Sequence, residues 1–82
     1  MTHNPMQIAT EVLQSLKPDI DLTALPADLV ASGMIDSFDL IMLVGEIESR
    51  TGCKVAGDLV RPEHFASLGA IASLVARVID AA

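Results

Sequence analysis

The stretch that decides the fold is Gly33-Met34-Ile35-Asp36-Ser37-Phe38-Asp39-Leu40. It ends a long segment without periodic apolar residues and begins a long helix that the sequence predicts. Asp36 is a favourable N-cap, and Asp39 lies in the first turn, where the positive end of the helix dipole favours acids. Gly33 allows a sharp turn of the backbone before the helix. The sequence therefore predicts a helix that begins at Ser37, with the serine hydroxyl exposed on its first turn.

A serine at this position has two interpretations. The unpaired N–H groups and the partial positive charge of a helix start would stabilise a phosphate attached to Ser37. The alternative is that Asp36-Ser37 is an ordinary helix start without a chemical role, because both residue types are common near helix N-termini. The helix start alone does not distinguish these two interpretations of Ser37.

Apolar residues recur at helical spacing in three long segments, and a fourth segment supports only a short helix. The four segments are residues 5–17, 37–50, 61–65 and 68–79. Asn4 and Ser67 are favourable N-caps, whereas Pro18 and Gly52 are residue types that end helices. No strand pattern is present, and residues 18–35 show no sustained period. The sequence therefore predicts an all-α four-helix bundle with a short third helix and a long loop between helices one and two.

The composition fits one small acidic domain that spans residues 1–82. Hydrophobic residues make up 51% of the chain, which is too much for intrinsic disorder. Eleven acids against five bases give a net charge of −6, which argues against nucleic acid and suits either plain solubility or docking to basic partners. Cys53 is the only cysteine, so no internal disulfide can form. Because neither a signal pattern nor a membrane-spanning run is present, we expect a cytoplasmic protein. We also expect a monomer.

Enzyme chemistry is not expected from these residues. A serine hydrolase needs a base beside its nucleophile, but the chain offers only His3 and His64 and has no G-x-S-x-G motif. One cysteine and two scattered histidines do not form a zinc site. Residues 19–30 begin like a calcium loop but lack its glycine and its final glutamate, so we expect no metal.

The predicted helix at residues 37–50 carries two apolar faces. The face spaced for burial consists of Leu40, Leu43, Val44 and Ile47. The second face, nearly opposite, consists of Phe38, Met42 and Gly45, and Ile41 lies between the two. Because exposed apolar patches usually mark contacts, we interpret the second face, with Asp39 and Glu46, as a partner surface. A helix buried on both sides is the alternative.

The helix start also resembles a known family. The segment Asp36-Ser37-Phe38-Asp39-Leu40-Ile41-Met42-Leu43-Val44 resembles the Asp-Ser-Leu segment of acyl and peptidyl carrier proteins. Residues 61–68 resemble the third helix of that family and its turn into the last helix. The resemblance implies that a phosphopantetheinyl transferase attaches 4′-phosphopantetheine from coenzyme A to Ser37, with Asp36 as helix cap and transferase contact. The chain would then be a non-catalytic substrate of other enzymes, holding its cargo as a thioester.

Two residues bear on the cargo that the resemblance implies. Phe38 follows the serine where leucine is commoner, and this resembles D-alanyl carriers and discrete aminoacyl carriers. Met42 lies where carriers of the fatty-acid type commonly have glutamate. Together they imply a free-standing carrier of an aminoacyl or short acyl group, loaded by an adenylating ligase or an acyltransferase and unloaded by a transferase or synthase. The alternatives are a fatty-acid or polyketide carrier and, in a different class, an unmodified helical interaction module.

Overall fold

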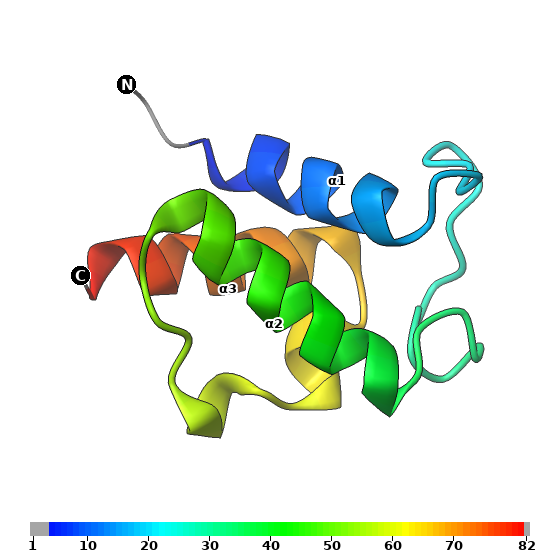
Figure 1. Ribbon diagram of the computed structural model, residues 1–82. Helices are drawn as coiled ribbons and strands as arrows, with labels where there is room; N and C mark the ends of the chain where they lie inside the picture. The colour runs from blue at the N-terminus through cyan, green and yellow to red at the C-terminus, as the bar shows by residue number, and fades with distance from the viewer. Residues whose placement is uncertain (1–3, 82) are drawn as a thin grey trace.

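The structure, a computed structural model, describes residues 4–81, which form three α-helices and two short 3-10 helices (Figure 1). The α-helices are α1 (Pro5–Leu16), α2 (Ser37–Thr51) and α3 (Leu68–Asp80). The 3-10 helices are η1 (Gly57–Leu59) and η2 (Pro62–Phe65), and residues 4–81 contain no strand. The prediction of an all-α domain with a long loop between its first two helices is confirmed.

The predicted short third helix at residues 61–65 is a 3-10 helix, so the domain has three α-helices and the predicted bundle of four is corrected. Pro62 begins the 3-10 helix η2, which has four residues and ends at Phe65. Ser67 then caps α3, and its Oγ accepts a hydrogen bond from the Ala70 N–H at 3.0 Å. So short a segment cannot repay the cost of nucleating an α-helix, and 3-10 geometry is the usual form of such pieces.

The ends of the long helices follow from their capping residues. The Asn4 side chain accepts hydrogen bonds from the backbone N–H groups of Met6 and Gln7, at 3.0 and 3.2 Å, as the sequence predicts for an N-cap. Gly52 ends α2 in the left-handed conformation with φ of 69°. That conformation favours glycine because glycine has no Cβ. Both helix ends lie within a residue or so of the predicted positions.

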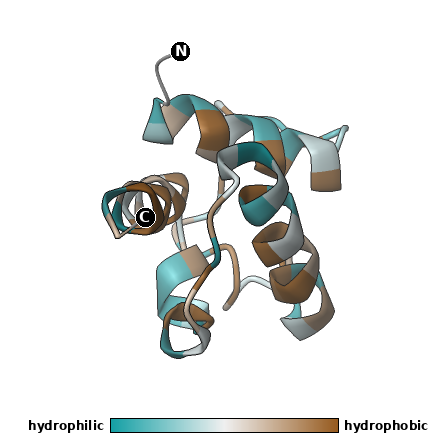
Figure 2. Cartoon of the chain, turned by 60° about the vertical axis from the view of Figure 1, so that its left-hand side comes forward, coloured by the Kyte–Doolittle hydropathy of each residue, from teal (hydrophilic) through white to brown (hydrophobic). Residues whose placement is uncertain are grey.

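The core is almost entirely aliphatic and lies between the three helices and η2. α1 packs against both α2 and α3, and η2 packs against the same two helices from the opposite side (Figure 1). Coloured by hydropathy, all three helices carry strongly hydrophobic segments (Figure 2). The largest completely buried side chains are those of Val12, Leu13, Leu29, Ile35, Leu43, Ile47, Phe65, Ile71, Leu74 and Val75. Within residues 4–81 no buried side chain is polar or charged.

The long loop before α2 is fixed to the core at two points. Leu29 and Ile35 are completely buried, and the Leu29 N–H donates to the Ala66 carbonyl at 2.7 Å. The Ile35 N–H donates back to the Leu29 carbonyl at 3.0 Å, which closes the segment between them. The residues that lead into α2 are therefore held in place by packing as well as by hydrogen bonds. Over the described part of the chain, no helix is both long enough and apolar enough to cross a membrane.

Candidate functional site

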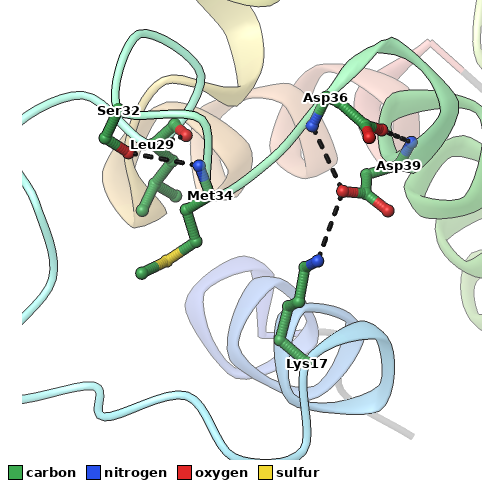
Figure 3. A network of polar contacts seen from close by, with 6 residues as sticks. All are labelled: Lys17, Leu29, Ser32, Met34, Asp36 and Asp39. Atoms are coloured by element: carbon green, nitrogen blue, oxygen red, sulfur yellow. Dashed lines mark hydrogen bonds and ion pairs between the residues drawn. The ribbon is translucent and has the colours of Figure 1, made fainter.

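A reciprocal pair of hydrogen bonds fixes the start of α2. Asp36 is the N-cap, and its Oδ1 accepts from the Asp39 backbone N–H at 2.8 Å (Figure 3). The Asp39 Oδ2 in turn accepts from the Asp36 N–H at 3.1 Å. This arrangement is a capping box, with aspartate in the place usually taken by glutamate or glutamine. The structure thus confirms Asp36 as the helix cap and gives Asp39 a second, equal part in the cap.

The backbone before the cap turns sharply at Gly33. Gly33 has φ of +83°, a left-handed conformation that costs glycine little. Its N–H donates to the Val30 carbonyl at 3.1 Å. The Ser32 hydroxyl donates to the Leu29 carbonyl at 3.1 Å, so that polar groups of the turn bond one another (Figure 3). The turn directs the chain from the buried Leu29 to the helix start, as predicted from the glycine.

Lys17, at the end of α1, contacts the cap from outside the helix. Its Nζ lies 3.4 Å from the Asp39 Oδ2, and the Asp39 side chain is only 16% exposed (Figure 3). This ion pair ties the end of α1 to the start of α2. Sequence reasoning missed Lys17, because a local pattern carries no signal for a contact between residues so far apart in the chain.

The pKa of the Asp39 carboxyl is lowered from its ordinary value. The main cause is the hydrogen bond from the Asp36 backbone N–H, which stabilises the ionised carboxylate. Partial burial opposes this effect, and the hydrogen bond and charge of Lys17 add to it. Asp39 is therefore ionised at neutral pH, and the cap is fully formed there.

Ser37 is the first residue of α2, and its side chain is exposed. The two side-chain hydrogen bonds of the cap join Asp36 to Asp39 and leave the Ser37 hydroxyl out. A serine that served as the N-cap would lose its capping bond on modification, but here Asp36 has that role. Ser37 therefore has an accessible hydroxyl on a preformed backbone, and the residues around it fit covalent attachment of a group at this oxygen.

The predicted partner surface of α2 faces outward. Phe38 is 70% exposed, Ile41 66% and Met42 48%, so the alternative of a helix buried on both sides is wrong. Gly45 is exposed as well, and Glu46 is half-buried and pairs with Arg50 at 3.7 Å. A groove of about 490 Å³ runs beside this face, lined by Ser15, Leu16, Ile41, Met42, Gly45 and Glu46. The five predicted surface residues thus share one side of α2 with Ser37 at its end, although Asp39 is partly covered by Lys17.

In the part of the chain that the structure describes, the remaining candidate groups do not assemble into a second site. Within residues 4–81, no group of three His, Cys, Asp or Glu is arranged to hold a metal ion. His64 is half-buried on η2, and His3 lies outside the described residues. Cys53 is half-buried, and its Sγ donates to the Thr51 carbonyl at 3.4 Å. The start of α2 is therefore the candidate functional site.

Comparisons of the chain with protein-family models, with curated proteins and with solved structures find no match.

Proposed function

We propose that this chain is a carrier protein that holds an aminoacyl or short acyl group as a thioester on a 4′-phosphopantetheine arm attached to Ser37. The observation that carries the proposal is the exposed Ser37 hydroxyl at the first residue of α2, outside the capping box of Asp36 and Asp39. Modification at this oxygen leaves every hydrogen bond of the cap intact. The helix can therefore present the same backbone to partner enzymes before and after modification.

The charges around Ser37 favour an attached phosphate that extends away from the protein. The helix N-terminus attracts negative charge, but the carboxylates of Asp36 and Asp39 lie on either side of the serine. Both carboxylates already accept backbone hydrogen bonds, and Lys17 neutralises that of Asp39. The helix start would thus stabilise a phosphodiester on Ser37, and the two carboxylates would repel it toward solvent. When attached, the arm supplies a terminal thiol on which the cargo is held.

The exposed apolar face of α2 suits enzymes that dock beside Ser37 in turn. Phe38, Ile41 and Met42 are apolar and exposed within two turns of the serine. The net charge of −6 steers the chain toward basic surfaces and speeds association more than it tightens it. Such a small charge-steered interface fits brief binding to a phosphopantetheinyl transferase, to a loading ligase or acyltransferase, and to a transferase or synthase that takes the cargo. We further propose that the chain acts as a monomer in the cytoplasm, where coenzyme A is available.

The packing around η2 favours a short cargo over a long acyl chain. Phe65 is completely buried, and η2 contacts both α2 and α3. A long chain that entered between these helices would have to displace Phe65 or its neighbours from a close-packed core. A fatty-acid or polyketide carrier is therefore the second choice. An unmodified interaction module would use the same exposed face of α2, and only the modification test separates it from a carrier.

The test is the mass of the intact protein after incubation with coenzyme A, magnesium and a broad-specificity phosphopantetheinyl transferase. We expect the mass of one phosphopantetheine to be added to the wild type and none to Ser37→Ala. The matched control is Ser49→Ala, which removes an exposed serine farther along the same helix and should be modified like the wild type. Circular dichroism should show all three proteins equally helical. A wild type that stays unmodified, or a Ser37→Ala protein that gains the mass, contradicts the proposal.

A further inference from the structure

A groove of about 260 Å³ lies between the end of α1 and the loop that leads to Ser37. It is lined by Leu16, Lys17, Pro18, Asp19, Ile20 and Met34. One wall is a β-turn directly after α1, in which the Ile20 N–H donates to the Lys17 carbonyl at 3.0 Å. Pro18 is the second residue of this turn, where its fixed φ is favourable. The turn thus holds Asp19 and Ile20 in place without help from a ligand.

The groove is next to the modification site. Met34 precedes Ser37 by three residues, so their Cα atoms are at most about 11 Å apart along an extended chain. Lys17, on the opposite wall, lies 3.4 Å from Asp39, which is two residues beyond Ser37. In Figure 3 the Met34 side chain points away from the loop toward the side where α1 lies, and the Lys17 side chain points from α1 to Asp39. A group tethered to Ser37 by a pantetheine arm is therefore within reach of the groove.

The lining of the groove combines small apolar area with one available negative charge. Leu16, Pro18, Ile20 and Met34 supply the apolar walls. Of the two charged groups, Lys17 is paired with Asp39, whereas none of the ion pairs found among residues 4–81 involves Asp19. The nearby Asp21 differs, because its carboxylate accepts from the Thr23 hydroxyl at 2.6 Å. The groove therefore matches a ligand that has a small apolar part and a positive charge.

We infer that this groove receives the aminoacyl group of the loaded carrier, with the Asp19 carboxylate as counter-charge to the free α-ammonium group. The inference rests on the proposed function and resolves the choice it leaves open between aminoacyl and short acyl cargo. A neutral acyl group would gain only the apolar contacts, and an anionic one would face Asp19 and a chain of net charge −6. Because the groove is open to solvent, the charge pair is worth only a few-fold in occupancy.

The experiment compares two stable cargoes attached through an amide in place of the thioester. Alanyl and isobutyryl groups have nearly the same shape, but only the alanyl group carries an ammonium. In amide NMR spectra we expect alanyl loading to shift the resonances of residues 16–20 and 34 clearly more than isobutyryl loading does. In a pH titration, Asp19 should raise the pKa of the alanyl amino group by a few tenths of a unit, as an exposed ion pair does.

The variants Asp19→Asn and Asp58→Asn remove the same charge from different places. Asp58 is exposed on η1 and does not line the groove, so its variant should behave like the wild type. Asp19→Asn should abolish both the difference between the cargoes and the rise in the amino pKa. If the protein takes up the arm but the two cargoes give the same spectra, or Asp19→Asn changes nothing, the groove inference fails alone. If the intact mass shows no arm at all, the carrier proposal fails and the inference fails with it.

Discussion

At the scale of single residues, the start of α2 divides structural and chemical tasks between neighbours. Asp36 and Asp39 cap the helix through each other's backbone N–H groups, and Ser37 between them is left exposed. The sequence analysis predicted Asp36 as the N-cap and placed Asp39 in the first turn, but it did not predict that Asp39 returns a hydrogen bond to the Asp36 N–H. Residue types and spacing could have shown this capping box, because it is a contact over three residues. Lys17 could not be predicted in the same way. Its contact with Asp39 depends on how α1 packs against α2, which no local pattern encodes.

The lowered pKa of Asp39 predicts how stability depends on pH. A carboxyl whose folded-state pKa lies below the ordinary value of 3.8 contributes stability above that value. The contribution is lost as the pH falls through the lower, folded-state pKa. In urea unfolding at a series of pH values between 7 and 2.5, wild type should therefore lose more stability below about pH 4 than Asp39→Asn does.

Asp21 provides the comparison for this measurement. The Thr23 hydroxyl and then the Thr23 backbone N–H lower the pKa of Asp21, while it sits in a separate turn of the loop. Asp21→Asn should reduce the loss of stability at low pH by the contribution of Asp21 alone. In the double variant the reductions from Asp21→Asn and Asp39→Asn should add. If Asp39→Asn is as sensitive to acid as the wild type, the ionised Asp39 carboxylate does not stabilise the fold through the cap.

At the scale of the element, α2 is a helix whose two apolar faces have different environments. Leu43 and Ile47 are completely buried, whereas Phe38 and Ile41 are mostly exposed. Periodicity predicted both faces, because the two sets of residues recur at helical spacing on opposite sides. Which face is covered depends on the positions of α1 and η2, and here the sequence alone left an alternative open. The 3-10 geometry of η2 was not predicted either, because four residues are too few to show a period.

The exposed face predicts losses of stability of very different size for two neighbouring substitutions in α2. Met42→Ala, at a side chain that is 48% exposed, should cost about 0.5 kcal/mol or less of unfolding free energy. Leu43→Ala, at a completely buried position, should cost about 2–5 kcal/mol. Denaturant unfolding gives both values, and Met42→Ala should also slow loading by the partner ligase. A loss of several kcal/mol for Met42→Ala would place Met42 in the core and remove it from the partner surface.

At the scale of the whole molecule, the core is filled by aliphatic side chains and one phenylalanine. The composition, with two phenylalanines and no tryptophan or tyrosine, already implies an aliphatic core. The helix order and the long loop could also be predicted from the sequence. The hydrogen bond from the Leu29 N–H to the Ala66 carbonyl could not be predicted, because it joins segments that are distant in the chain. That bond, with the buried Phe65, keeps the loop, η2 and α3 together beside the start of α2.

This filled core should limit the size of the cargo that the domain can bury. Wild type is loaded through Ser37 with alanyl, acetyl or octanoyl groups, and each form is melted. Burying even about 100 Å² of an octanoyl chain would contribute about 2.5 kcal/mol, which raises the melting temperature of a domain this size by roughly 10–20 °C. Because Phe65 is completely buried and already fills the space beside η2, we expect the octanoyl form to melt within about 4 °C of the other two. Strong stabilisation by octanoyl, with shifted amide resonances near Ile41 and Phe65, would instead reveal an acyl pocket, and the fatty-acid or polyketide carrier would become the better proposal.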